Sequence, residues 1–576
     1  MFKRLSSIYQ HRKWEIVMLC IIIGIGIFFR TYNFSDWLLF EVDQTYDTRI
    51  VSQAIENGIE NLPLLGPTAG GGRALRLGPA FYYMEYASAL VFGDTPTGHA
   101  MLVLIFSILS LPLFYLFSRR YFGIPISLSL LAIFSSSVFL VLYGRFSWSP
   151  NVLPFLILLS FYALLRSVSR SETEIKRSRF FLLSAAAIAL TSQIHFNSFF
   201  TIPAIAIIFL LYKRPRFPVK TWLMAFMIIA LVYSPMVLSD ISTSGENVNL
   251  FLKKISKGGS VPFEDAVRKS IVTIQYNASG YFFVTTGIDR ISGKRIKDYG
   301  FQNDANLPWR SLAITLIIAE LCLIVLAMRK ERDADRRDFL VLIFLWASIP
   351  FAYFYSLISG NFHFYPRFYL LIAPVAVIFF GFLLQMLHPE RHAARRAILA
   401  GITLIVLVPN ITRIFDHFLS LANPERDEVS VEREDIFPND KRLTLDEQLA
   451  ITEFMIDKQR KNGYPIYIAT YGEYEPVFWY HLGKQGLFYS DRVNESHLYA
   501  EGNYFLIRYP NAKIRSEKED FIIEDKEKFG ALAVYTMTPQ ETSIDELRQP
   551  TKDYKEFLQT SQIRDLATWK TFFNNL

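Results

Sequence analysis

Four acidic residues lie close together directly after the first apolar run of the chain: Asp36, Glu41, Asp43 and Asp47. Asp43 and Asp47 are four positions apart, so a helix here would present both carboxylates on one face. A carboxylate where an apolar segment meets water is suited to act as a general base, which takes a proton from a reacting hydroxyl. The structural alternative is that Asp43 caps a helix over 44–57. We take Asp43 as the first candidate base, with Glu41 and Asp47 as the other catalytic candidates.

Arginines in the same part of the sequence could bind an anion. The segment GPTAGGGRALRLGP contains three consecutive glycines together with Arg73 and Arg76. Glycine lets the backbone approach a ligand closely, and guanidinium groups match phosphate oxygens. The glycine spacing fits neither a nucleotide-binding loop nor a dinucleotide fingerprint, which argues against a nucleotide ligand. A flexible loop with solvated arginines is the alternative. Arg145 and Arg367, at the ends of later apolar runs, are further phosphate-binding candidates.

Aromatic and histidine residues at the ends of apolar runs are candidates for contacting a substrate: Tyr82, Tyr83, His195 and His363. A single polar side chain in such a place commonly reaches toward lipid headgroups instead. The functional interpretation gains weight because the topology below puts these residues on the same side of a membrane as Asp43. No spacing of His, Cys, Asp and Glu matches a metal site, so we expect neither a metal nor a cofactor.

The composition indicates a membrane protein. The 576 residues are 51% hydrophobic and 20% charged, whereas soluble domains carry about 25% charged residues. Uncharged runs cover 16–29, 370–385 and 397–408, which excludes disordered, collagen-like and disulfide-scaffold classes. The net charge of +7 does not indicate nucleic acid, because the basic residues gather in short loops between apolar runs. Both cysteines lie inside apolar runs, so no disulfide is expected.

The basic loops also predict a topology, because such loops remain in the cytoplasm. They cover 3–13, 119–120, 166–179, 213–220, 329–337 and 388–396. An even number of crossings must separate each pair of loops, which is possible only if the apolar segment 79–93 does not span. That segment contains Glu85 and is shorter than the roughly 20 residues a span needs. We therefore predict an interfacial helix there and about eleven transmembrane helices, with 193–197 at the tip of one helical pair.

The chain divides into two predicted domains. Residues 1–413 would form the membrane body, with a 30–98 outer loop carrying interfacial helices and a second outer loop over 239–310. Residues 414–576 alternate between helical and strand-like patterns, which predicts a soluble α/β domain. The predicted fold is thus a mostly α, multi-pass protein of the cell (plasma or inner) membrane. Its N-terminus would be cytoplasmic and its C-terminal α/β domain extracytoplasmic.

The motifs resemble those of polyprenyl-phosphate-dependent membrane glycosyltransferases of the GT-C type. This group, family 39 and its relatives, includes protein O-mannosyltransferases and the lipid A aminoarabinose transferases. The family places an Asp-Glu pair in its first outer loop, where this chain has Asp43-Gln44. A family segment His-Pro-Pro-Leu-Tyr-Tyr is matched by LGPAFYYMEY, which keeps Pro79, Tyr82 and Tyr83 without the histidine. An Arg-Tyr pair before a proline-containing helix is matched by PRFYLLIAPVAVIFF. The departures indicate a divergent member.

The resemblance implies a GT-C fold and an inverting transfer at the outer membrane face. A sugar would pass from a polyprenyl-phosphate donor to a hydroxyl of a glycan, lipid or protein acceptor, with Asp43 as general base and without a metal. Membrane lipids would be partners and nucleic acid would not. Alternatives are a secondary transporter or flippase, an O-antigen ligase or polymerase, and an inactive paralogue. Transporters usually place ionisable residues near the bilayer midplane and show internal repeats, neither of which stands out here.

Overall fold

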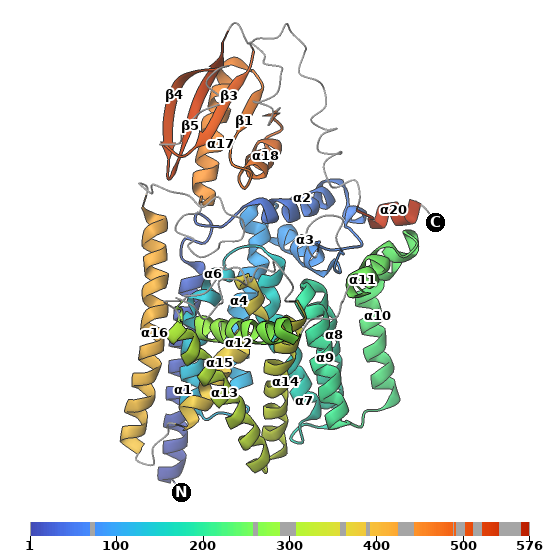
Figure 1. Ribbon diagram of the computed structural model, residues 1–576, viewed down its shortest axis with the longest axis vertical. Helices are drawn as coiled ribbons and strands as arrows, with labels where there is room; N and C mark the ends of the chain where they lie inside the picture. Colours follow the sequence, from blue (N-terminus) through green and yellow to red (C-terminus); the bar gives the residue numbers. More distant parts are fainter. Residues whose placement is uncertain are drawn as a thin grey trace.

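The protein is a bundle of long helices that carries a small sheet domain at one end, as the computed structural model in Figure 1 shows. The structure describes residues 2–68, 75–256, 263–288, 307–357, 365–386, 392–423, 443–487, 489–490, 501–510, 521–540 and 566–574. The candidate residues Arg73 and His363 lie outside these ranges.

The eleven predicted spans, two of which (124–142 and 368–387) are divided in the structure, overlap eleven helices. They are α1 (Phe2–Thr31), α4 (Pro96–Ser118), α5 (Ile124–Ser136), α7 (Leu153–Val168), α8 (Glu174–Ile194), α9 (Phe196–Lys213), α10 (Val219–Ser242), α13 (Leu307–Lys330), α14 (Ala334–Leu357), α15 (Ala373–Met386) and α16 (His392–Ala422). Within the described ranges, eight of them are long and apolar enough to cross a membrane. The other three are the short apolar helices α5 and α15 and the helix α8, whose first turns are charged.

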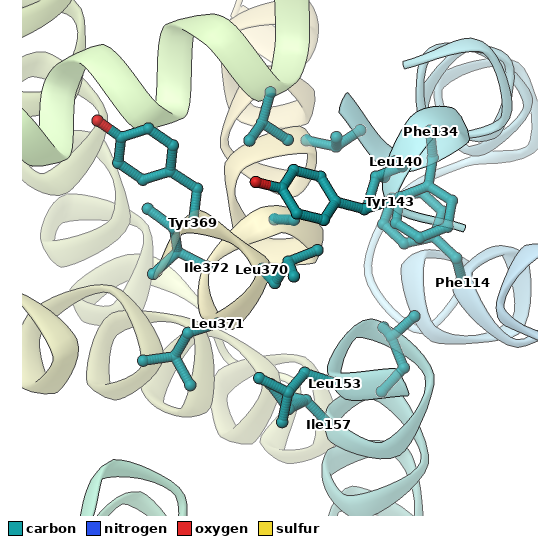
Figure 2. Packing of buried hydrophobic residues seen from close by; sticks show 14 of the residues in the cluster. Phe114, Phe134, Leu140, Tyr143, Leu153, Ile157, Tyr369, Leu370, Leu371 and Ile372 are labelled. Carbon is teal, nitrogen blue, oxygen red and sulfur yellow. The ribbon is translucent and has the colours of Figure 1, made fainter. Parts of the chain in front are cut away.

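The bundle is apolar on the outside as well as inside. Phe226 and Leu231 of α10 and Ile405 of α16 are each 70% exposed or more, as expected for side chains that face lipid. Inside, α4 and α5 pack through Phe114 and Phe134, whose rings stack with centroids 4.2 Å apart. Figure 2 shows these rings beside Leu140, Tyr143, Leu153, Ile157 and residues 369–372. A bundle of long helices that is apolar in its interior and also on its outer surface is typical of a multi-pass membrane protein.

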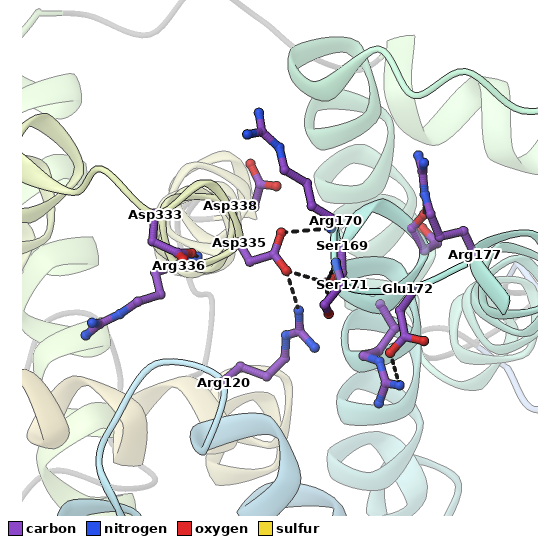
Figure 3. Close-up of polar contacts among 12 residues, drawn as sticks. Arg120, Ser169, Arg170, Ser171, Glu172, Arg177, Asp333, Asp335, Arg336 and Asp338 are labelled. Atoms are coloured by element: carbon purple, nitrogen blue, oxygen red, sulfur yellow. Dashed lines mark hydrogen bonds and ion pairs between the residues drawn. The ribbon is translucent and has the colours of Figure 1, made fainter. Parts of the chain in front are cut away.

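Four of the predicted basic loops meet around the start of α14, and Figure 3 shows residues of three of them, those after α4, α7 and α13. Asp335 at the start of α14 accepts a hydrogen bond from the backbone N–H of Arg170 at 3.1 Å and lies 3.7 Å from the Arg120 guanidinium. Lys213 at the end of α9 pairs with Asp338. The loops after α4, α7, α9 and α13 therefore share one side of the bundle, which is the arrangement that the charge pattern predicts.

Two short helices, α2 (Val42–Asn57) and α3 (Ala80–Phe92), lie at the opposite end, between the bundle and the sheet domain (Figure 1). We call this the domain end. The 13 residues of α3 cover only about 20 Å, too little to cross a bilayer, and α3 ends at Gly93, whereas the equally short α5 is continued by α6 (Val138–Tyr143). This agrees with the prediction that 79–93 does not span. The apolar segment 124–142 divides because the chain bends at Ser137 between α5 and α6.

The predicted outer loop 239–310 contains two helices that the sequence reading did not anticipate, α11 (Glu246–Ser256) and α12 (Phe263–Thr286). Figure 1 shows α12 running across the long helices of the bundle. Its C-terminal end is held by Asn410 of α16, whose amide donates to the carbonyl of Thr285 at 2.9 Å. Its middle accepts a hydrogen bond at the Tyr276 carbonyl from Tyr369, which belongs to the 3-10 helix η4 (Pro366–Leu371).

The C-terminal part is an α/β domain, as predicted. It contains α17 (Leu445–Asn462), β1 (Ile466–Ala469), α18 (Glu475–Lys484), β2 (Tyr489–Ser490), β3 (Asn503–Arg508), β4 (Phe521–Phe529) and β5 (Leu532–Pro539). The sheet order is β2-β1-β3-β5-β4; β1 runs parallel to β2 and β3, and the other pairs are antiparallel. The edge strand β4 was not predicted, because FIIEDKEKF is largely charged.

The C-terminal domain holds the residues on both sides of α2. The backbone of Asp446 donates to the carbonyl of Asp36 at 3.1 Å, and the Gln448 amide donates to the carbonyl of Phe40 at 2.8 Å. The last described segment returns to the loop after α2, where Leu64 donates to the Ala567 carbonyl at 2.8 Å and Trp569 donates to the Leu62 carbonyl at 3.2 Å.

Candidate functional site

The first turn of α2 positions the acidic residues. Glu41, and not Asp43, occupies the N-cap position, with an extended backbone at φ −137°. Gln44 closes the turn by accepting a hydrogen bond from the Glu41 N–H at 3.1 Å. Asp43 lies inside the first turn, where a negative charge is favoured by the exposed N–H groups of the helix. The interpretation of Asp43 as the cap of this helix is therefore wrong, and its carboxylate is partly exposed.

Asp47 lies one turn further along and is buried at 6% exposure. Its Oδ1 accepts a hydrogen bond from the Tyr82 hydroxyl of α3 at 3.0 Å. Burial raises the pKa of Asp47 well above its usual value, and the nearby carboxylates of Glu85 and Asp43 raise it further, against the opposing effect of Tyr82. The two acids on this face of α2 thus differ, since one tends to keep its proton and the other meets solvent.

Glu85 of α3 belongs to the same cluster, although sequence reasoning used it only to argue that α3 does not span. It is fully buried, and its Oε1 accepts a hydrogen bond from the Ser147 hydroxyl at 2.6 Å. The Nδ1 atom of His99, in the first turns of α4, lies 3.6 Å from the same oxygen. An ionisable residue inside an apolar run was the available signal, because such residues are costly to bury and are usually functional.

The glycine-rich segment closes against itself beside this cluster. The Gly66 N–H donates to the Leu77 carbonyl at 2.7 Å, and a Cβ at Gly66 would lie 2.1 Å from the carbonyl oxygen of Gly78. Arg76 is held by its backbone, which exchanges two hydrogen bonds with the Asn247 amide. Its guanidinium lies close enough to Tyr82 to favour the ionised phenol electrostatically. The Arg76 guanidinium, which lies 3.4 Å from the Gly66 carbonyl oxygen, is therefore within electrostatic range of Tyr82.

Tyr83 has a different environment from its neighbour Tyr82. Its hydroxyl donates to the Pro63 carbonyl at 2.9 Å and accepts from the Trp569 indole N–H at 2.9 Å. Its hydroxyl therefore joins the loop after α2 to the C-terminal segment.

Arg367 and His195 form a second group at the junction of η4 with α8 and α9. The Arg367 guanidinium lies over the rings of Trp148 and Tyr365, 5.1 Å and 4.6 Å from their centroids. Burial lowers the pKa of His195, and the nearby positive charge of Arg367 lowers it further, to about 3. The ring is therefore neutral, and its Nδ1 accepts from the Asn197 N–H at 3.2 Å, which leaves the proton on Nε2.

The turn between α6 and α7 joins this second group to the acidic cluster. Trp148 lies under Arg367, while the preceding Ser147 donates to Glu85. Two consecutive residues, Ser147 and Trp148, thus contact Glu85 of the acidic cluster and Arg367 of η4, respectively. Among the residues that the structure describes, no group of three His, Cys, Asp or Glu side chains could hold a metal ion.

Arg145 lies in the same turn but is used differently. It is 5% exposed, and its guanidinium donates to the carbonyls of Phe29 and Arg30 at 3.0 Å and to that of Tyr32 at 2.8 Å. These are carbonyls that the end of α1 leaves without partners inside the helix. Its donors are engaged by the backbone, so phosphate binding by Arg145 remains a prediction from the sequence alone.

Comparison with known proteins finds no matching family model and no matching curated protein. Solved structures with a similar layout include ArnT from Cupriavidus metallidurans, at 10% identity and TM-score 0.49 over 93% of this chain and 100% of that one. The archaeal oligosaccharyltransferase AglB from Archaeoglobus fulgidus is 12% identical at TM-score 0.47, over 82% of this chain and 64% of that one. Arabinofuranosyltransferase AftD from Mycobacteria is 13% identical at TM-score 0.35, over 92% and 42%. These similarities by themselves assign the chain neither a family nor an activity.

Proposed function

We propose that this protein is an integral-membrane glycosyltransferase that moves a sugar from a polyprenyl-phosphate donor to an acceptor hydroxyl. The observation that carries the proposal is the pair of carboxylates on one face of α2. Asp43 is partly exposed at the domain end, while Asp47 behind it is buried, bonded to Tyr82 and biased toward its neutral form. Neighbouring carboxyl groups in unlike surroundings, one buried and one partly exposed, are typical of sites that do acid–base chemistry.

In the proposed reaction Asp43 takes the proton of the acceptor hydroxyl while that oxygen attacks the anomeric carbon of the sugar. The bond from the anomeric carbon to the phosphate oxygen breaks, and the lipid phosphate leaves with the bonding electrons. A single displacement of this kind inverts the anomeric configuration. Because no carboxylate becomes bonded to the sugar, one general base is sufficient.

The leaving phosphate gains negative charge, which fixed cations in a water-poor site stabilise. Arg76 and Arg367 are the described side chains that we assign to this role, and Arg73 joins them on the sequence motif. Both described arginines are partly exposed at the domain end. The donor class comes from the motif resemblance, and the apolar outer surface of the bundle is compatible with a lipid carrier that approaches from the bilayer. The acceptor would be a glycan, a lipid or a protein.

One observation favours the alternative of a secondary transporter. Glu320 lies within α13, a helix apolar enough to span, and is 8% exposed. Acids inside membrane helices often belong to ion or proton paths. A transporter would move a solute across proteoliposomes without transferring a sugar, so the two functions have separate assays.

The test is transfer by the purified full-length protein in lipid nanodiscs, supplied with radiolabelled polyprenyl-phosphate sugars and a panel of acceptors. We expect label to move from the lipid phase to one acceptor class and to be lost in Asp43→Asn. If no donor is consumed, or if Asp43→Asn transfers at the wild-type rate, the proposed mechanism is wrong. Counter-transport in proteoliposomes without transfer would favour the transporter.

A further inference from the structure

A row of charged side chains connects the C-terminal domain with the buried carboxylate of Glu85. Lys484, at the end of α18, has its Nζ 2.5 Å from Asp94 Oδ2 and 2.9 Å from Glu56 Oε1. The other oxygen of Asp94 lies 2.8 Å from Nε2 of His99. The other nitrogen of His99 faces Glu85 Oε1 at 3.6 Å. The row thus begins in the soluble domain and ends in the acidic cluster of the site.

Burial increases along this row. The side chains of Glu56 and Lys484 are 57% and 28% exposed, that of Asp94 is 18% exposed, and those of His99 and Glu85 are inaccessible. Charges interact more strongly where water is excluded. A change at the exposed end therefore acts on groups whose charges are least screened.

Asp94 is the link that transmits the effect of Lys484. Although burial opposes it, hydrogen bonds from His99, Lys484 and Ser52 lower the pKa of Asp94, so its carboxylate is ionised. An ionised carboxylate only accepts hydrogen bonds, so Nε2 of His99 must carry a proton toward it. This contact sets the orientation of the imidazole ring.

The other side of the ring faces the carboxylate of Glu85 without a hydrogen bond between them. At 3.6 Å, a proton on Nδ1 would make the ring a cation that attracts the Glu85 carboxylate, whereas a bare Nδ1 would repel it. In the described part of the chain, neither His99 Nδ1 nor Glu85 Oε2 has a hydrogen-bond partner. Glu85 in turn acts electrostatically on Asp47. The protonation of the His99–Glu85 pair therefore influences the charge beside the proposed base.

We propose that Lys484 is a positioning residue for the site in the membrane body. By holding Asp94, it sets the orientation of His99 and the charge of the His99–Glu85 pair, and thereby the charge next to Asp47 and Asp43. The inference rests on the proposed function, and it makes the docked C-terminal domain part of the catalytic geometry. Loss of Lys484 lets Asp94 and the imidazole reorient, which disturbs the base while leaving Arg76 and Arg367 in place.

The first test measures transfer by the full-length chain with Lys484→Met, Lys484→Arg, Asp94→Asn and the double variant Asp94→Asn/Lys484→Met. We expect kcat to fall about tenfold to a hundredfold in Lys484→Met with little change in the donor KM, since misplacement of a catalytic group has effects of this size. Lys484→Arg restores most of kcat, and the double variant is no worse than Asp94→Asn. Additive losses, or an unchanged kcat in Lys484→Met, would overturn the proposal.

Glu56→Gln is the matched control, because it removes a contact of the same ammonium group on the side away from His99. It leaves kcat near the wild-type value if Lys484 acts through Asp94. An equal loss in Glu56→Gln and Lys484→Met would instead mean that both residues only dock the domain. Thermal unfolding of each variant shows whether the domain remains folded.

The second test does not depend on sugar transfer. Nitrogen NMR of ¹⁵N-histidine-labelled protein, with the His99 signals assigned by their loss in His99→Gln, reports the protonation of both ring nitrogens. We expect Lys484→Met to shift these signals and Glu56→Gln to leave them. If His99 responds while the wild type transfers no sugar, the proposed function fails and the linkage stands. If sugar is transferred but neither His99 nor kcat responds to Lys484→Met, the linkage fails.

Discussion

The buried and the partly exposed charged residues around the proposed site are held in opposite ways. Asp47 and Glu85 are buried, and each accepts a hydrogen bond from a side chain of another element. Arg76 and Arg367 remain partly exposed, whereas the buried Arg145 donates to the carbonyls at the end of α1. A buried ion must be satisfied within its own chain, so it has little capacity for a ligand. Burial therefore separates the residues that hold the structure together from those that we propose contact a substrate.

The largest expected effect comes from Asp43, the partly exposed acid. Asp43→Asn keeps the size and hydrogen-bonding capacity of the side chain but removes its basicity. Transfer falls by roughly 10²–10⁴-fold, the usual contribution of a positioned acid or base. Initial rates measure the loss, and equilibrium binding of labelled donor shows that the lipid still binds. Glu41→Gln is the control, because it changes only the start of α2 and should transfer at a near-normal rate. A normal rate in Asp43→Asn together with a lost rate in Asp47→Asn would identify Asp47 as the base.

Arg145 is expected to affect stability more than transfer. Arg145→Met removes hydrogen bonds to at least three carbonyls and exposes the end of α1. Each such bond from a charged group contributes roughly 1.5–3 kcal/mol, so we expect a loss of about 2 kcal/mol or more in the free energy of unfolding. Thermal unfolding in detergent measures it. A rise in the donor KM with unchanged stability would instead return Arg145 to the phosphate site.

Arg76 and Arg367 are expected to affect the donor. Arg367→Ala and Arg76→Ala raise the donor KM or lower kcat by about tenfold, which corresponds to about 1.4 kcal/mol of lost transition-state binding. Lysine restores little, because a point charge does not reproduce the two parallel donors of a guanidinium. Steady-state kinetics with the donor varied measures both variants. Unchanged kinetics in both would remove these arginines from the site.

The raised pKa of Asp47 should make the stability of the fold depend on pH, an effect smaller than those of the arginine variants. Its folded pKa lies above the ordinary value of 3.8, so the folded protein retains a proton that the unfolded chain releases. Stability therefore falls as pH rises from about 4 through the folded pKa, at up to about 1.4 kcal/mol per pH unit. Asp47→Asn lacks this contribution and shows a flatter dependence of the unfolding midpoint on pH. An unchanged pH slope would mean that Asp47 is ionised in the folded state.

The mildest changes are single cysteines that report topology without altering activity. Cysteine at Glu172 or Ala334 tests the end of the bundle that carries the basic loops, and cysteine at Glu524 tests the sheet domain, in a background lacking Cys20 and Cys322. We expect an impermeant reagent in intact cells to label position 524 alone. Labelling at 172 would contradict the orientation that places the acids and arginines outside.

Hydropathy and charge were sufficient to predict the long helices and the shared side of their basic loops, because these signals are local. The α/β domain was also predictable from alternating patterns, apart from the charged edge strand β4 and the two-residue strand β2. Helix α12 was not, since its polar residues Gln275 and Asn277 face the interior of a bundle whose shape the sequence does not reveal. Its helical period was read as an ordinary loop.

The site was only partly predictable, for a different physical reason. The acids on α2 follow from local spacing, but the pairing of Glu85 with His99 depends on how α3 turns into α4. Lys484 reaches Asp94 from a separate domain, and no spacing rule connects them. Arg145 and Arg367 look alike in sequence, since both end apolar runs. In the structure they differ, because Arg145 is surrounded by backbone carbonyls and Arg367 by aromatic rings.

The pairing of residues 62–64 with 567–569 has a consequence for biosynthesis. The loop after α2 emerges early from the ribosome, yet the backbone groups it bonds are made some five hundred residues later. The helices of the bundle can be inserted one after another, but the hydrogen bonds of this loop can form only after residues 567–569 have been synthesised. Contacts between such distant parts of a chain form late in folding. Truncation before Ala567 should therefore yield a protein that inserts and spans the membrane normally. Its loop after α2, beside the acidic cluster, would lack the hydrogen bonds that order it.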